Sequence, residues 1–195
     1  TGHWFAVDHD SVVPDILTTA KGITGAYIPL GLTATSDEIA RHFEDHYFAH
    51  GHTYEAHPLT LAPAVAAIAE YKRLGLLERS RTLGEVLGGK LRALAAKHPS
   101  VGDVRGRGLF WAVDLVKDRA AKTPFNTQDE KLAGKPLLID QVTGKMSQLG
   151  VYCVGWISHL VIAPPLIITE SEIDDGVRAL DEALAISDAA QSAHD

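Results

Sequence analysis

One lysine stands where a side-chain amine could do covalent chemistry. Lys21 follows an apolar segment, Asp15–Ala20, and precedes a glycine-containing loop from Gly22 to Gly31. An amine at the end of a strand can project into a cleft. If the cleft is dry, the lysine loses its proton more easily and can condense with an aldehyde to form a Schiff base. The alternative is an ordinary solvated lysine after a strand, and the position alone does not separate the two.

A second candidate is the loop from Gly51 to Pro58, which reads Gly-His-Thr-Tyr-Glu-Ala-His-Pro. The hydroxyl of Thr53 and the backbone N–H groups around His52 could form a phosphate cradle, because successive N–H groups in such a turn can converge on an anion. The simpler interpretation is a plain connection of the Ω-loop type. Composition alone favours that simpler interpretation.

A metal site is a third possibility in the same part of the chain. Five histidines lie close together there: His42, His46, His50, His52 and His57. His42 and His46 are four residues apart, so on a helix they would share one face and could hold an ion. The glutamate is Glu44 rather than a neighbour of His42, so the metalloprotease pattern is not met. Solvated histidines on a helix face are commoner, and we expect no metal site.

Two further groups of residues stand near expected strands. The run Arg105–Gly108, Arg-Gly-Arg-Gly, has guanidinium groups that could fork onto a carboxylate or phosphate. Its glycines instead favour a tight backbone turn before the next strand. Phe110 and Trp111 are expected in the core. Trp156 and His159 lie in a glycine-flanked loop between two expected strands, so they are better placed to face a pocket.

Helices and strands occur in an order typical of an α/β or α+β fold without internal repeats. Apolar spacing and capping residues predict helices over 37–43, 60–77, 83–98, 136–149 and from the Thr169–Glu172 capping box onward. Short β-branched and apolar runs predict strands at 15–20, at 150–154, at 160–162 and as a pair within 101–116. The largely polar segment 117–135 is expected to be a loop insertion.

Composition limits the partners and the compartment. The chain has 195 residues, 46% of them apolar, which is typical of a globular protein of one domain or one and a half. A net charge of −7 without a basic cluster argues against nucleic acid or an anionic membrane as partner. The longest apolar stretch, 160–168, contains two prolines and is shorter than the roughly 20 residues that cross a bilayer. A single cysteine, Cys153, suits a reducing, cytoplasmic compartment.

Taken together, six ordered segments resemble class III (omega-type) aminotransferases, enzymes of fold type I that depend on pyridoxal 5'-phosphate. The segments are Thr1-Gly2-His3-Trp4-Phe5-Ala6, Pro14–Ile23, Pro29-Leu30-Gly31, Gly51–Tyr54 with His57-Pro58, Val104–Leu109, and Ala163–Thr169. Within the class, Trp156-Ile157-Ser158-His159 before Ala163-Pro164-Pro165 is most similar to taurine–pyruvate and related omega-amino acid–pyruvate aminotransferases.

The resemblance implies a role for each candidate. Lys21 would carry the cofactor as a Schiff base and, once released, move a proton between substrate and cofactor carbons. Thr53, with the backbone at His52, would reach the cofactor phosphate of the neighbouring subunit, so a homodimer or higher assembly with a shared active site is expected. Trp156 and His159 would contact the substrate. Many family members place a carboxylate-binding arginine three residues before the first proline of the Pro-Pro pair; here that residue is Val161.

Other parts of the family's active site are expected outside these residues. The aspartate beneath the pyridine nitrogen, the phosphate loop, the aromatic residue on the ring and most of the central sheet lie upstream of Thr1 in the family. The chain starts without an initiator methionine or signal peptide, and this start is expected to lie inside a longer protein. We therefore expect these 195 residues alone to bind the cofactor weakly and not to turn over.

The resulting hypothesis assigns residues 1–58 to the end of a large cofactor-binding domain. Residues 59–195 would form a bridging helix and a small α+β domain. The complete enzyme, with its N-terminal half, would transfer an amino group from an amine or omega-amino acid to a 2-oxo acid such as pyruvate. The alternative is a truncated, non-catalytic module that serves only folding or dimerisation.

Overall fold

The computed structural model of the chain describes residues 1–192, which divide into two compact units. The first, which we call the hairpin unit, is His3–Leu77. The second, the sheet unit, consists of Thr1–Gly2 and the chain from Glu78 onward. The two units are therefore described separately. None of the helices within the described residues is both long and apolar enough to cross a membrane.

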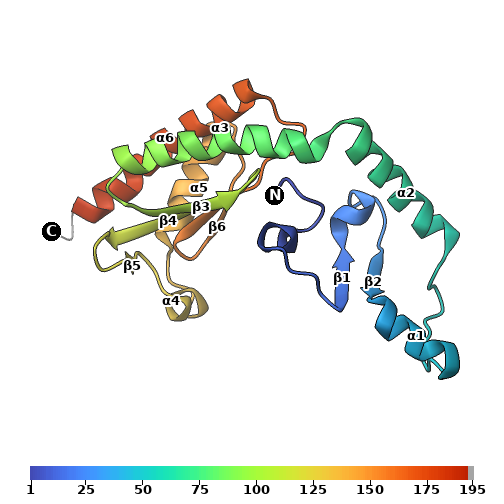
Figure 1. Cartoon of the computed structure of the whole chain (residues 1–195). Coiled ribbons are helices and arrows are strands. Elements are labelled where there is room, and N and C mark those ends of the chain that lie inside the picture. The colour runs from blue at the N-terminus through green and yellow to red at the C-terminus, as the bar shows by residue number, and fades with distance from the viewer. Residues whose placement is uncertain (193–195) are drawn as a thin grey trace. The chain divides into compact units, whose positions relative to one another are not determined.

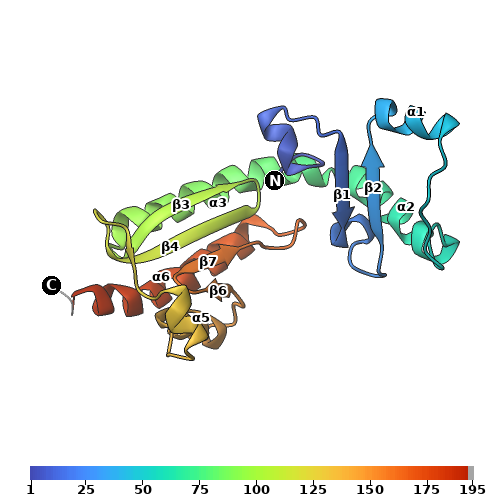
Figure 2. The ribbon, with the colours of Figure 1, turned by 90° about the horizontal axis from the view of Figure 1, so that it is seen from below.

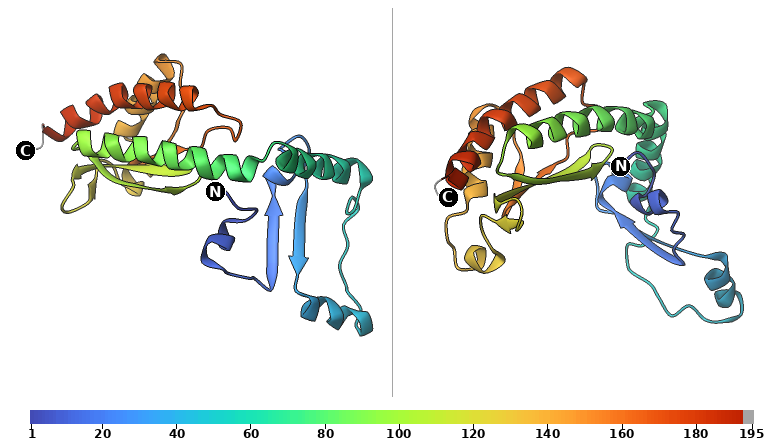
Figure 3. Two further views of the ribbon diagram at one scale, coloured as in Figure 1. Left: turned by 45° about the horizontal axis from the view of Figure 1, so that its top comes forward. Right: turned by 60° about the vertical axis from the view of Figure 1, so that its left-hand side comes forward.

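The hairpin unit is built on one antiparallel strand pair. Its elements are a 3₁₀ helix at Ala6–Asp10, β1 at Ile16–Ala20, a 3₁₀ turn at Lys21–Thr24, β2 at Gly31–Thr35, α1 at Asp37–Asp45 and α2 at Pro58–Arg73. The strands pair from Ile16 with Thr35 to Ala20 with Gly31 (Figure 3). The predicted strand before Lys21 is confirmed. β2 was not predicted, because all five of its residues are exposed and show no buried alternation.

The hairpin unit buries few of its own apolar side chains. Within its described residues, Thr24, Ala64 and Leu76 are buried. Large apolar side chains remain in solvent, among them Val13, Tyr27 and Tyr47, each at least 90% exposed. Because apolar burial supplies most of the stability of a domain, this unit has the character of a part of a larger domain.

The sheet unit has a four-stranded antiparallel sheet in the order β3-β4-β7-β6, with β5 added beside β4. Its elements are α3 at Leu76–Lys97, β3 at Val101–Arg107, β4 at Phe110–Asp118, β5 at Thr123–Pro124, α4 at Gln128–Leu132, α5 at Leu138–Gln148, β6 at Val154–Trp156, β7 at His159–Ile162 and α6 at Glu170–Ser192. Side chains of α3, α5 and α6 share one core with the sheet, so these helices cover one of its faces (Figures 1 and 2). We call the opposite face the open face.

Alternation along β4 sets which residues enter the core. Trp111, Val113 and Leu115 point into the core, and each is at most 5% exposed. The core prediction for Trp111 is confirmed. The same prediction for Phe110 is wrong: it is 56% exposed, because successive residues of a strand point to opposite faces. The glycine turn before this strand is confirmed, since Gly108 has a φ of +57° between β3 and β4.

The predicted helices are present with different bounds, and the one expected over 83–98 runs from Leu76 to Lys97. The helix expected over 60–77 ends at Arg73, and Gly75, with a φ of +60°, separates it from α3. The expected loop 117–135 contains β5 and the short helix α4. The strand expected from residue 150 starts only at Val154, because Gly150 and Val151 donate backbone hydrogen bonds to the last turn of α5 and so cap that helix.

The start and the end of α6 are both fixed by polar contacts. The predicted capping box is present: the Thr169 N–H donates to the Glu172 carboxylate at 2.7 Å, and the Glu172 N–H donates to the Thr169 hydroxyl at 3.3 Å. Near the other end, the buried His98 places its ring nitrogens 2.6 Å from Asp188 and 2.7 Å from Asp181. Burial alone would raise the pKa of Asp188, but hydrogen bonds from Ser100 and His98 lower it below its usual value.

Replacing either of two glycines of α3 by alanine should change the free energy of unfolding, in opposite directions at the two positions. A Cβ on Gly84 would overlap backbone atoms of Gly108, which cannot rotate away, so Gly84→Ala is expected to lower the free energy of unfolding by about 3 kcal/mol. A Cβ on Gly89 would meet no atom within 4 Å, so Gly89→Ala should raise that free energy by up to about 1 kcal/mol through helix propensity. Urea unfolding of both variants measures the difference. Equal changes in the free energy of unfolding would refute the close packing of α3 on the turn between β3 and β4.

Candidate active site

Lys21 lies at the point where β1 ends and the chain turns. It is the first residue of the 3₁₀ turn Lys21–Thr24 and has a φ of +56°. The turn is held from inside by Thr24, which is 1% exposed and donates its hydroxyl to the Ile28 carbonyl at 2.8 Å. A non-glycine residue in the left-handed region is uncommon and costs free energy, and such residues cluster at functional sites. The backbone thus fixes the direction of the Cα–Cβ bond of Lys21.

The hairpin unit by itself does not enclose the Lys21 amine. The residue is exposed, and among the described residues no carboxylate lies within ion-pair distance of it. Its neighbours Ala20 and Gly22 line a concavity of about 440 Å³ with Trp4 and Tyr71. The amine is therefore unpaired and accessible, whereas the dry crevice expected around it is not formed by the described residues of this single chain.

His52 and Thr53 lie in the exposed connection between α1 and α2. The His52 N–H donates to the Glu55 carboxylate at 3.1 Å, and the Glu55 N–H donates to the His52 carbonyl at 3.1 Å. The His52 N–H thus has a carboxylate acceptor within its own loop. No hydrogen bond or ion pair within the described chain joins Lys21 to His52 or Thr53.

The histidines around α1 stack on one another. The rings of His42 and His46 are parallel, with centroids 4.0 Å apart, and His46 Nδ1 lies 2.7 Å from the His42 carbonyl oxygen. Across the part of the chain that the structure describes, no group of three or more His, Cys, Asp or Glu side chains is arranged to hold a metal ion.

The first arginine of the Arg-Gly-Arg-Gly run, Arg105, is engaged in ion pairs on the open face. Arg105 donates to Asp103 at 2.9 Å and to Asp114 on the neighbouring strand. The hydrogen bond to Asp114, followed by the one to Asp103, raises the pKa of Arg105 above its usual value. Two carboxylates neutralise this guanidinium, which supports the structural interpretation of the run.

Trp156 and His159 face each other across a tight strand pair. They are directly opposed in the pairing of β6 with β7, and Ile157 takes a φ of +58° in the turn between them. Trp156 is 49% exposed and His159 is half-buried. His159 also lines a cavity of about 420 Å³ with Arg105 and Asp114. The structure thus brings Trp156 and His159 together on the open face, beside a polar hollow.

Sequence reasoning missed one charged residue beside this pair. The ammonium of Lys131, in α4, lies 3.1 Å above the centroid of the Trp156 ring. The polar composition of 117–135 predicts a loop, although Thr127 and Glu130 form the same capping-box pattern that identifies the start of α6. That pattern was the signal that could have revealed α4 and, with it, Lys131.

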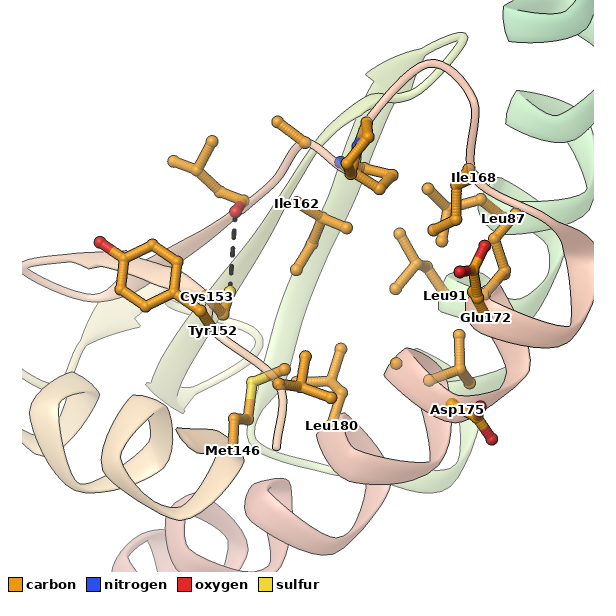
Figure 4. Close-up of a pocket in the computed structure, with 18 of the residues that line it drawn as sticks. Leu87, Leu91, Met146, Tyr152, Cys153, Ile162, Ile168, Glu172, Asp175 and Leu180 are labelled. Carbon is orange, nitrogen blue, oxygen red and sulfur yellow. Dashed lines mark hydrogen bonds between the residues drawn. The ribbon is translucent and has the colours of Figure 1, made fainter. Parts of the chain in front are cut away.

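A separate apolar cavity of about 490 Å³ lies on the core side of the sheet (Figure 4). Leu91, Met146, Ile162 and Leu180 form part of its walls. Cys153 also lines it, and burial raises the pKa of this thiol to about 11. A thiol that stays protonated at neutral pH is a poor nucleophile, so Cys153 contributes packing rather than chemistry.

Comparison with known proteins gives one consistent family. The family model described as class-III aminotransferase matches residues 1–184. A taurine–pyruvate aminotransferase from Bilophila wadsworthia is 36% identical over 197 residues, which cover 94% of this chain and 41% of the relative. The chain thus spans less than half the length of that relative.

Solved structures agree in sequence and in fold. An S-selective transaminase from Arthrobacter sp. with alanine bound has a TM-score of 0.86 and 32% identity, covering 95% of this chain and 41% of its own. A taurine:2-oxoglutarate aminotransferase from Bifidobacterium kashiwanohense, in complex with PLP and glutamate, has a TM-score of 0.86 and 32% identity, covering 97% of this chain and 42% of its own.

Proposed function

The chain belongs to the class-III aminotransferases, and from this we propose that it works with the upstream half that its relatives carry as an aminotransferase. The reaction would move an amino group from an amine or omega-amino acid to a 2-oxo acid such as pyruvate. The observation that carries the proposal is the family match over residues 1–184, together with an accessible lysine that is presented from a left-handed turn at a strand end.

The cofactor of this family, pyridoxal phosphate, supplies an aldehyde that takes up the amino group and a ring that accepts electrons. Lys21 fits the amine that would hold it, because its side chain is accessible and no carboxylate is paired with it among the described residues. In the proposed reaction the released Lys21 amine accepts a proton from the substrate carbon and returns it to the cofactor side. The turn supports this role because it fixes the direction of the Cα–Cβ bond from which the amine extends.

We assign His52 and Thr53 to the cofactor phosphate of a neighbouring subunit. The contact of the His52 N–H with the Glu55 carboxylate supports this assignment, because it shows that the N–H is accessible to an anionic oxygen. The Thr53 hydroxyl would add a second donor in the same turn. A phosphate would replace the Glu55 oxygen. This arrangement requires a homodimer, or a larger assembly, with a shared active site.

We assign Trp156 and His159 to the substrate side of the site. Their opposed positions on the open face, and the polar hollow beside His159, support a contact with substrate. For the domain organisation we propose that residues 1–58 complete the cofactor-binding domain. The remaining residues, 59–195, would supply the bridging helix and the small domain.

The test compares the complete protein with the isolated chain of 195 residues. With pyridoxal phosphate, an amine donor and pyruvate, the complete protein should form alanine and show cofactor absorbance that borohydride fixes to the protein. The isolated chain should show neither, because the pyridine-binding half is upstream in the family. Strong, borohydride-stable labelling of the isolated chain would contradict this dependence. Failure of the complete protein with every donor would favour the non-catalytic folding or dimerisation module.

A further inference from the structure

We propose that Lys131, held over the ring of Trp156, binds an anionic group of the substrate, a carboxylate or a sulfonate. The inference rests on the proposed function. It assigns to this end of the open face a preference for substrates that carry a carboxylate or a sulfonate. The observations that carry it are the register of the sheet, the unpaired ammonium and the contacts that fix α4.

The register of the sheet places the relevant residues on one surface. Asp114 of β4 is opposed to His159 of β7, and His159 is opposed to Trp156 of β6. Directly opposed residues on antiparallel strands point to the same face, so these three side chains form one row on the open face. Val161 and Val154 form the next row towards the other end of the same strands. Figure 2 shows β4, β7 and β6 side by side.

Lys131 supplies this surface with a positive charge. Its ammonium is 3.1 Å from the centroid of the Trp156 ring, and no carboxylate among the described residues forms an ion pair with it. Lys135, a few residues along the chain, instead pairs with Glu130 at 3.5 Å. An aromatic face attracts a cation without neutralising it, so the N–H groups of Lys131 that point away from the ring can still donate to an anion.

The backbone of the helix that carries Lys131 is held in place before any ligand arrives. The Thr127–Glu130 capping box starts α4, and the Asn126 N–H donates to the Ser158 hydroxyl at 2.9 Å. The same hydroxyl donates back to the Asn126 carbonyl at 3.2 Å. This reciprocal pair ties the start of α4 to the turn between β6 and β7. A cation on a backbone held in place in this way loses less conformational entropy when an anion binds than one on a mobile segment would.

Arg105, another cation on this face, is less available to bind a substrate anion. Arg105 is engaged by Asp103 and Asp114, so a substrate anion would have to compete with two carboxylates for it. The row beyond Trp156 consists of Val154 and Val161, which can contact the apolar part of a substrate but cannot bind its anionic end. Lys122 also lines the hollow beside His159, but Lys131 is the cation that lies over the Trp156 ring.

The test uses matched donors on the complete enzyme, with Lys131→Met, Lys131→Arg and the control Lys135→Met. β-Alanine and 2-aminoethanesulfonate carry an anionic end, whereas propylamine of similar size does not. Lys131→Met should lower kcat/KM for the anionic donors at least ~10-fold, because a charge-assisted hydrogen bond contributes a free energy of this size. The kcat/KM for propylamine should stay within about 2-fold of wild type. Lys131→Arg should retain most of the activity, and Lys135→Met should match wild type.

A second arm identifies which substrate supplies the anion. If the KM for pyruvate rises in Lys131→Met even with propylamine as donor, the bound anion is that of the 2-oxo acid, which also supports the inference. Equal kinetics of Lys131→Met and wild type for all donors and for pyruvate would overturn it. Absence of turnover in wild type would instead overturn the proposed function, so the two failures are distinct.

A spectroscopic readout separates binding from a general loss of structure. With 5-fluorotryptophan incorporated, the ¹⁹F resonance of Trp156, assigned through Trp156→Phe, should shift as 2-aminoethanesulfonate is added, because an anion bound to the ammonium changes the electric field at the ring. The shift should be absent in Lys131→Met and with propylamine. An unchanged Trp156 resonance in wild type at saturating donor would contradict direct binding by Lys131.

Discussion

Replacing Lys21 by alanine in the complete protein should lower kcat at least ~10³-fold for every amine donor, since one side chain is assigned both cofactor attachment and proton transfer. The lysine is accessible and held in a left-handed turn, so truncation removes the amine without removing a core contact. The free energy of unfolding should therefore change little. Stopped assays of alanine formation, with urea unfolding in parallel, measure both quantities.

The matched control is Lys72→Ala, which removes the other lysine of the hairpin unit from an exposed helix position. This variant should retain wild-type turnover. Lys21→Arg should be as inactive as Lys21→Ala, because a guanidinium keeps the positive charge but stays protonated and does not serve as the required amine. After borohydride treatment, peptide mass spectrometry should find the cofactor on Lys21. Attachment to another lysine, or near-normal turnover of Lys21→Ala, would refute the assignment.

The elements that were predictable from the sequence are those with a strong local signal. The capping box at Thr169 fixed the start of α6, and the β-branched run before Lys21 marked β1, because both patterns act through adjacent residues. Gly108 in the turn before β4 could be inferred for the same reason, since only its own φ is involved. In each case the local preference and the tertiary environment agree.

The errors lie where a neighbouring strand or helix decides the outcome. Phe110 and Trp111 are both aromatic, and only the register of β4 on its neighbours shows that Trp111 enters the core. Strand β2 carries no buried alternation, so its pairing with β1 left no mark on its sequence. After α5 ends at Gln148, Leu149, Gly150 and Val151 donate backbone hydrogen bonds to its last turn, which delays the start of β6.

The candidate site shows the same contrast between what the local sequence predicts and what neighbouring elements decide. Residue types and order placed Lys21, Thr53 and Trp156 among the chemically relevant residues, but they said nothing of what surrounds them. Lys131 was identified by its contact with the ring of Trp156, which joins a helix and a strand that are far apart in sequence. The exposure of Lys21 in the single chain likewise makes its surroundings a question of assembly, which a mixing experiment can address.

Mixing two inactive variants should restore activity if Thr53 acts across a subunit boundary. Lys21→Ala removes the amine, and Thr53→Asp places a carboxylate where the cofactor phosphate is proposed to bind, so each variant alone should be inactive. In a symmetric dimer with shared sites, a mixed dimer has one site with both defects and one intact site. Half of the dimers in a random mixture are mixed, so the activity should return to about a quarter of wild type.

The reciprocal mixture supplies the control for this argument. Wild type combined with the double variant Lys21→Ala/Thr53→Asp should give about a quarter of wild-type activity if Thr53 acts across subunits, because mixed dimers then have no intact site. If Thr53 acts within its own chain, the two results change in opposite directions: the first mixture stays inactive and the second rises to about half. Because both mixtures contain the same two substitutions in equal amounts, a general folding defect cannot produce the crossed pattern. Only a shared site at His52 and Thr53 predicts recovery in the first mixture without the higher value in the second.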